Sequence, residues 1–455
     1  MQSSRRTFLK VLGAGAAAAF TGLPSLDALG DVSAATGQTE FFVFIIALGG
    51  WDVTLWADPR NELRGIVHPA STENTDTSQV KRWVDAPLAD GAFKSFELVR
   101  PKGSNLVFGP GIGDLADMAD RITVVNGLEM NTVAHPDGQV FSTTGRHPNG
   151  GRVAASSIDT VLSNELGREQ LFPTVSVRFP SSYVGDNLDR RVVPLAIDDV
   201  GSISRTLSRS GLYDASPERD RVTALLSEEA HDLAKRSTYP DVLDGMSLQY
   251  ESLRRMLSSN LQDVFSGAGL RKAHPELDYK RRFTGAPAVN VAFALEAMKR
   301  NVVRCVSFAI GGFDTHANNY RTHAQLQQET FDLVAALVRS LDATPHPVKA
   351  GAKLGEHTHI LVVSDFCRTP QINLAMGRDH YPNNSALVVS PRFRGNFAFG
   401  KTDVEQLLPQ PAKKFADGAR AIAPPDLLAT FLSAFGVDPR KYMRDGEVVP
   451  ELLRS

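Results

Sequence analysis

The segment that decides the fold covers residues 359–382 and reads HILVVSDFCRTPQINLAMGRDHYP. Residues 360–363 are apolar and mostly β-branched, which is the pattern of a strand buried on both faces of a parallel sheet. The apolar run stops at Ser364 and Asp365, where a hydroxyl and a carboxylate follow. In open α/β sheets, ligands bind just beyond the carboxyl ends of the strands. Asp365 is therefore a candidate ligand-binding residue.

Two other apolar runs end in the same way. FFVFIIALGGWD leads through a glycine pair to an acid, and VVRCVSFAIGGFDTH ends in an acid and an imidazole. A further acid–imidazole pair lies near the end of the opening segment, between a glycine and a proline, and we predict that it is on a loop. Carboxylates and imidazoles gathered at one edge of a sheet suit hard and borderline metal ions. We predict a metal site with the ligands Asp52, Asp314, His316, Asp365 and His380. The alternative is that these side chains only cap strand ends and fix loops.

Size and charge limit the class of protein. The chain has 455 residues, of which 42% are hydrophobic, enough for one large α/β domain with insertions or for two domains. The formal net charge is −2 and the basic residues are scattered, so there is no electrostatic footprint for nucleic acid. Two cysteines, Cys305 and Cys367, exclude a disulfide scaffold. They are small buried hydrophobes or form a single disulfide.

Residues 1–34 have the composition of an export signal rather than of a folded domain. SRRTFLK (residues 4–10) precedes the weakly apolar VLGAGAAAAFTGL, and VSA (residues 32–34) resembles a cleavage site. We predict a twin-arginine signal, read by the twin-arginine export machinery, and a periplasmic or secreted mature protein. The alternatives are an ordinary secretory signal or a membrane anchor. The apolar run is shorter than the ~20 residues that span a bilayer, so we expect no stable membrane span after cleavage.

Strand patterns alternate with helix patterns, which indicates a layered α/β fold. We predict strands at residues 41–48, 122–125, 174–177, 192–197, 302–310, 360–363 and 384–389. We predict helices at residues 112–119, 158–166, 320–341 and 424–436. Residues 217–300 carry long amphipathic patterns, which are either a helical insertion or helices that flank the sheet. Residues 57–110 and 126–151 are polar and glycine-rich, and we predict loops there.

The motifs GGWD, GGFDTH, SDFCRTP, GRDH and DLLATFLSAFGVDP together resemble a family of twin-arginine-exported proteins, the domain-of-unknown-function family 1501. That family is similar in motif order and spacing to the alkaline phosphatase and sulfatase superfamily. The resemblance spans residues 40–445. It implies an alkaline phosphatase-like, three-layer α/β sandwich with a mostly parallel central sheet. It also implies two divalent metal ions (zinc, manganese or magnesium) at the strand ends.

The resemblance implies a position for each ligand. Asp314 and His316 would hold one metal, joined by His380, and Asp365 would hold the other together with Asp52. The chain departs from the active enzymes at three points. The residue after the SDF acid is a phenylalanine where phosphatases usually have a histidine, the acid and imidazole of GGFDTH are unusually close in sequence, and no nucleophile is identifiable. These departures leave the second metal and a covalent step open.

Three residues are candidates for catalytic roles. Arg368 could bind a tetrahedral anion as a planar fork, or form a salt bridge to Asp365 or Asp379. His135 could be an acid–base group, a further metal ligand, or only a hydrogen-bonding residue. Thr132 is a candidate nucleophile by residue type. The other hydroxyls considered, which are more often caps, are Ser142, Thr143 and Thr144.

These observations predict an exported, metal-dependent hydrolase that acts on a phosphate or sulfate ester of a small molecule or polymer. The main alternative is a catalytically inactive relative with the same fold, serving as a secreted binding or assembly protein. A third possibility is a hydrolase of unrelated chemistry that uses one metal.

Overall fold

The computed structural model describes residues 39–59, 98–185, 188–207, 232, 261–317, 319–371, 373–375, 377–404 and 406–454. The predicted signal lies outside these residues. So do most of the 57–110 segment and, apart from Asp232, the amphipathic patterns between residues 217 and 260. No helix in the described ranges is long and apolar enough to cross a membrane.

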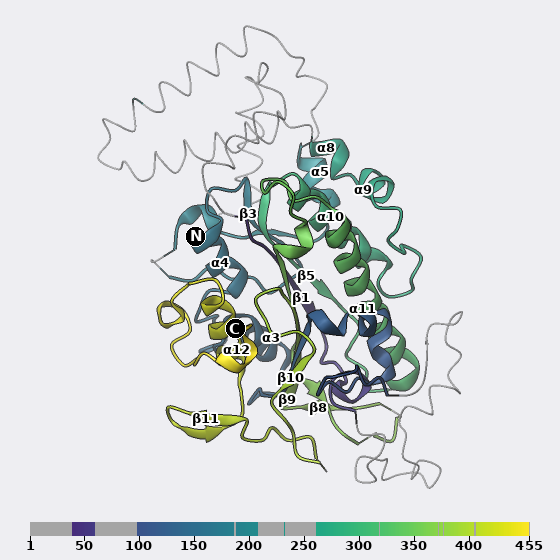
Figure 1. Ribbon diagram of the computed structural model, residues 1–455, viewed down its shortest axis with the longest axis vertical. Coiled ribbons are helices and arrows are strands. Elements are labelled where there is room, and N and C mark those ends of the chain that lie inside the picture. The colour runs from purple at the N-terminus through teal and green to yellow at the C-terminus, as the bar shows by residue number, and fades with distance from the viewer. Residues whose placement is uncertain are drawn as a thin grey trace.

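An eight-stranded sheet forms the centre of the protein (Figure 1). Its strand order is β10-β2-β9-β6-β1-β5-β3-β4. Neighbouring strands pair in parallel, except that β9 runs antiparallel to both β2 and β6. The strands are β1 (Phe41–Ala47), β2 (Ile122–Glu129), β3 (Phe172–Val177), β4 (Leu195–Ile197), β5 (Val303–Ile310), β6 (Thr358–Ser364), β9 (Asn383–Val389) and β10 (Phe397–Phe399).

Helices cover both faces of this sheet (Figure 1). Along β1, Val43 and Ile45 pack into the core on one face, and Phe42 and Phe44 pack into the core on the other. α10 (Gly285–Lys299), α11 (Asn319–Ala343) and the 3-10 segment η6 (Pro110–Arg121) cover the first face, whereas α4 (Ile158–Leu166) and α12 (Pro424–Ser433) cover the second. Both faces of the central strands are thus apolar, as the unbroken hydrophobic runs predicted. The three-layer α/β sandwich with a mostly parallel sheet is confirmed.

Smaller elements complete the described chain. Two short hairpins are β7 (Cys367–Arg368) with β8 (His380–Tyr381), and β11 (Lys413–Phe415) with β12 (Gly418–Arg420). The remaining α-helices are α3 (His135–Thr144), α5 (Gly201–Leu207), α8 (Leu261–Val264) and α9 (Gly267–Ala273). The remaining 3-10 turns are η2 (Val53–Leu55), η7 (Arg190–Val192), η8 (Leu354–Glu356), η9 (Pro439–Lys441) and η10 (Pro450–Leu452).

The predicted loop at residues 126–151 is wrong in two places. β2 continues to Glu129 because its pairing with β9 resumes after a bulge, where Gly127 has a φ of 65°. α3 then fills residues 135–144, with a proline in its first turn and Gly145 in the left-handed conformation at its end. Glycine and proline here mark a bulge and helix ends rather than a continuous loop.

Three other predicted elements differ from the structure. The 192–197 strand is a 3-10 turn followed by β4, with Pro194 between them. The pair Asp379–His380 does not lie on a plain loop, because His380 begins β8 and pairs with Arg368. The predicted 112–119 helix is the 3-10 segment η6, interrupted at Gly113.

Candidate metal centre

The loops at the carboxyl edge of the sheet meet because three glycines let their backbones touch. A Cβ added at Gly49 would lie 2.3 Å from the Asp314 nitrogen, and one at Gly377 would lie 2.0 Å from the His316 carbonyl carbon. A Cβ at Gly138 in α3 would lie 2.3 Å from the Asp365 carbonyl oxygen. Side chains at these positions would therefore push apart the segments that follow β1, β5 and β6.

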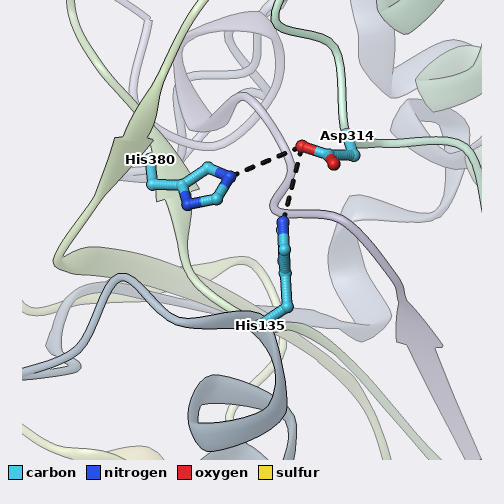
Figure 2. A group of neighbouring side chains, drawn as sticks. All are labelled: His135, Asp314 and His380. Atoms are coloured by element: carbon cyan, nitrogen blue, oxygen red, sulfur yellow. Dashed lines mark hydrogen bonds and ion pairs between the residues drawn. The ribbon is translucent and has the colours of Figure 1, made fainter.

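His135, Asp314 and His380 form the centre of this edge (Figure 2). One potential ligand atom from each lies within 4.8 Å of the others. Asp314 Oδ1 is 3.4 Å from His135 Nε2 and 3.5 Å from His380 Nε2. His316 adds a third imidazole, because its Nε2 lies 3.1 Å from Asp314 Oδ1 and 3.0 Å from His380 Nε2. Three ring nitrogens thus surround one carboxylate oxygen.

The other nitrogen of each ring is held by an oxygen. His135 Nδ1 lies 2.7 Å from Asp365 Oδ2, and His316 Nδ1 lies 2.7 Å from Asp379 Oδ1. His380 Nδ1 lies 2.7 Å from the carbonyl oxygen of Val133. Because a carboxylate and a carbonyl can only accept, each Nδ1 carries the proton and donates it. In the neutral rings each Nε2 then has a lone pair directed at the cluster, which is the tautomer that binds metal.

Asp314 is kept ionised although it is partly buried. Partial burial alone would raise its pKa, but the guanidinium of Arg368, 2.6 Å from Asp314 Oδ1, outweighs this and lowers the pKa to about 2. Burial lowers the pKa of His380, which favours its neutral form. An anionic oxygen beside imidazole nitrogens is a suitable ligand set for a borderline divalent ion.

Asp365 supports His135 from behind. Its side chain is buried, and its Oδ2 accepts hydrogen bonds from the backbone N–H of Gly49 at 3.0 Å and from Gln139 Nε2 at 3.2 Å, besides that from the His135 ring. The hydrogen bond from His135 to this carboxylate raises the pKa of His135, against the effect of burial. Asp365 therefore orients an imidazole of the cluster.

Asp52 lies in a separate buried network. Its carboxylate accepts from the backbone N–H and hydroxyl of Thr54 and from Asn319 Nδ2 at 2.8 Å, and it forms an ion pair with Arg378 Nε at 2.9 Å. Its own backbone N–H donates to Nε2 of His323, whose pKa burial lowers to about 3. Of the five predicted ligands, Asp314, His316 and His380 are in mutual contact, whereas Asp365 contacts His135 and Asp52 contacts Arg378.

Arg368 is buried, and its donors face chain oxygens rather than solvent. Nε donates to Gly50 O at 2.9 Å, and one terminal nitrogen donates to Arg378 O at 3.0 Å. The other terminal nitrogen contacts Gly49 O and Asp314. The salt bridge predicted as its alternative role thus exists, but with Asp314 rather than with Asp365 or Asp379.

The candidate nucleophiles have local partners. Ser142 Oγ donates to Ser364 O at 2.7 Å, and the hydroxyls of Thr143 and Thr144 donate to carbonyls one turn back in α3. Thr132 Oγ1 accepts from the backbone N–H of Ala134 at 3.2 Å, just before α3 begins. These contacts are those of caps and helix hydroxyls.

The Phe366 ring packs against two imidazoles of the cluster. Its ring centroid lies 4.8 Å from that of His135 and 4.7 Å from that of His380. It is buried in a small core cluster with Met130 and Phe141. The position that departs from the phosphatase pattern is therefore filled by a packed aromatic ring.

Sequence reasoning missed the residues that support the rings, although some signals were present. Gln139 lies four residues after His135, so both fall on one face of α3 and reach the same carboxylate. Asp379 directly precedes His380, yet it binds the ring of His316 from another loop. No sequence spacing indicates the Val133 carbonyl.

The chain has low similarity to several solved structures. It matches Ps i-CgsB in complex with k-i-k-neocarrahexaose at 11% identity, a TM-score of 0.34, and 90% coverage of this chain and 75% of that one. It matches the lipoteichoic acid synthase LtaP from Listeria monocytogenes at 8% identity and a TM-score of 0.34, covering 91% and 78%. It matches the PsFucS1 sulfatase from Pseudoalteromonas sp. at 10% identity and a TM-score of 0.34, covering 95% and 77%.

None of the curated proteins compared with the chain matches it. A family model, in contrast, matches residues 43–448, which include the motifs GGWD, GGFDTH, SDFCRTP, GRDH and DLLATFLSAFGVDP. The chain therefore belongs to the family described as "Protein of unknown function (DUF1501)".

Proposed function

We propose that this protein is a metal-dependent hydrolase that acts on a phosphate or sulfate ester. One divalent ion would be held by His135, His316, His380 and Asp314. The observation that carries the proposal is the convergence of three Nε2 atoms on Asp314 Oδ1, with each Nδ1 held by an oxygen acceptor. If both rings are protonated only at Nδ1, the lone pairs of His316 Nε2 and His380 Nε2, 3.0 Å apart, repel each other unless a cation or a proton lies between them.

The charges around the cluster also support a divalent ion. Asp314 pairs with Arg368 and Asp52 pairs with Arg378, so each of these two pairs is neutral. The carboxylates that hold His135 and His316, which are those of Asp365 and Asp379, then contribute two negative charges. One divalent cation would balance them. Buried His135 Nε2 also has no hydrogen-bond partner among the described residues, as a metal ligand would not need one.

The ligand types favour zinc over the other candidate ions. Imidazole nitrogens suit zinc, whereas manganese and magnesium prefer oxygen-rich sets. A site with three histidines and one carboxylate is therefore a poor magnesium site. Manganese remains the second candidate.

The neighbouring side chains support hydrolysis by water. A divalent ion held there would act as a Lewis acid toward an ester oxygen and an attacking water. Asp314 and His316 are about half exposed, at 52% and 47% of their side-chain surface, so the cluster is open to substrate on one side. Phe366 closes the other side. The candidate hydroxyl nucleophiles have local partners, which favours water over a covalent intermediate. The ester class comes from the motif resemblance.

The test uses full-length protein, with metal content and turnover of aryl phosphates and aryl sulfates as readouts. His316→Ala and Asp314→Ala should lose bound metal and turnover. His147→Ala is the control, because this histidine is exposed and lies outside the cluster, and it should keep both. Metal binding without turnover would support the alternative of an inactive binding protein. Metal-free, inert but folded wild-type protein would contradict the proposal.

We further propose export by the twin-arginine route, supported by the SRRTFLK segment. Replacing Arg5 and Arg6 by lysine should retain the protein in the cytoplasm, as measured by cell fractionation. Replacing Lys102, which lies in the mature chain, is the matched control and should not change the distribution. Unchanged export of the paired variant would contradict this route.

A further inference from the structure

We infer that the group hydrolysed carries a single negative charge, as in a sulfate monoester or a phosphate diester, rather than the two charges of a phosphate monoester. The inference rests on the proposed function and specifies its substrate class. It follows from how the charges around the cluster are already compensated.

Neither Arg368, which pairs with Asp314 of the cluster, nor Arg378, which pairs with Asp52, is available to a substrate. Both are buried. Arg368 donates to Gly50 O and Arg378 O and pairs with Asp314. Arg378 donates to the carbonyls of Thr369 and Pro370 and pairs with Asp52. Neither can offer the bidentate fork by which proteins usually bind doubly charged phosphate.

The half-exposed side of the cluster is acidic. Asp314 and Asp379 expose 52% and 54% of their side-chain surface. An anion that approaches from solvent therefore meets carboxylates before it meets the ion. Each added negative charge on the ligand increases this repulsion, because Coulomb energy is proportional to charge.

Phe366 removes the position where a second cation would need a ligand. The residue after Asp365 offers only an aromatic ring, which packs on His135 and His380. Asp365 Oδ2 already accepts three hydrogen bonds. Among the residues that the structure describes, His135, Asp314 and His380 are the one group of three or more His, Cys, Asp or Glu side chains close enough to hold an ion. A second divalent ion, which in two-metal sites shares the charge of a phosphoryl group, has no comparable set of ligands among them, although Asp365 Oδ1 is buried without a hydrogen-bond partner. With one divalent ion the charges of the centre sum to zero. A substrate with one negative charge therefore leaves a smaller net charge than a substrate with two.

The test compares two non-hydrolysable ligands that share an aryl group and differ in charge. Phenylphosphonate carries two charges at about pH 8.5, well above the second pKa of such groups, and its monomethyl ester carries one. Isothermal titration of zinc-loaded, full-length protein should show at least about tenfold tighter binding of the monomethyl ester, which corresponds to ~1.4 kcal/mol. Asp379→Asn, which removes one exposed charge but keeps an acceptor for His316, should reduce this preference several-fold. Asp417→Asn, at an exposed position in the β11–β12 hairpin, should not change it.

Turnover provides the second readout and separates sulfate from phosphate diester. Aryl sulfate and bis-aryl phosphate should each be compared with aryl phosphate monoester by kcat/KM. Equal or tighter binding of the doubly charged ligand, or faster turnover of the monoester, would overturn the inference and leave the proposed hydrolase intact. Binding of neither ligand, together with no turnover of any ester, would overturn both.

Discussion

The most informative perturbation is at Asp379, because it supports a predicted ligand without being one. Asp379 Oδ1 lies 2.7 Å from His316 Nδ1 and also accepts from Asn373 Nδ2 at 3.1 Å. Asp379→Ala removes the acceptor that holds the His316 ring and fixes its tautomer. Asp379→Asn keeps an acceptor but removes the charge.

Loss of such a supporting partner typically weakens metal affinity by 10–100-fold. We expect about 100-fold for Asp379→Ala, or ~2.7 kcal/mol. For Asp379→Asn we expect about tenfold, because the side chain is 54% exposed and solvent screens part of its charge. Neither change should lower the unfolding temperature of the metal-free protein by more than a few degrees, since the side chain is not in the core.

The assay is competition for zinc against a chelator of known affinity, followed by absorbance or fluorescence. Asp417→Asn is the control, because it also removes an exposed carboxylate that contacts an arginine. If Asp379→Ala binds zinc within twofold of wild type while His316→Ala loses it, the supporting role of Asp379 is refuted. If both variants bind as wild type does, His316 is not a ligand.

Three further predictions concern stability. Removing metal with a chelator should lower the melting temperature, and adding zinc should restore it. A ligand present at 100 times its dissociation constant adds about 2.7 kcal/mol to the free energy of unfolding. An unchanged melting curve would exclude a tightly bound ion. Gly138→Ala should destabilise the fold by more than about 1 kcal/mol, because the added Cβ would meet a backbone oxygen. Gly267→Ala is the control and should be tolerated, because the atom nearest to its added Cβ is 3.6 Å away. Equal denaturation midpoints for the two variants would contradict this. Burial would raise the pKa of Glu40, but the hydrogen bond from His359 outweighs burial and lowers the pKa to about 2. The ionised Glu40 therefore stabilises the fold. This contribution is complete above the unfolded pKa near 4.5 and is lost as the pH falls toward 2. Glu40→Gln should therefore cost about 1–3 kcal/mol at neutral pH and flatten the acid side of the stability profile; parallel profiles for the two proteins would refute it.

Much of the fold could be predicted from the sequence because it depends on local patterns. The apolar runs of β1, β5 and β6 are buried on both faces, and such runs need helices on both sides. Helix α12 begins at its proline pair as predicted. The loop prediction failed where a glycine marks a bulge or a helix end, as at Gly127 in β2 and Gly145 after α3.

The candidate site, like the fold, could be predicted from the sequence only in part. The sequence by itself placed acids and imidazoles at the carboxyl ends of the strands, because strand ends follow from hydrophobic runs. Only the tertiary structure decided that Asp52 pairs with Arg378, that Asp365 orients His135, and that Asp379 holds His316. These partners are 63 to 326 residues apart in the chain, and no local spacing encodes which way a side chain turns once three loops meet. That choice depends on the backbone contacts at Gly49, Gly138 and Gly377, which exist only in the folded protein.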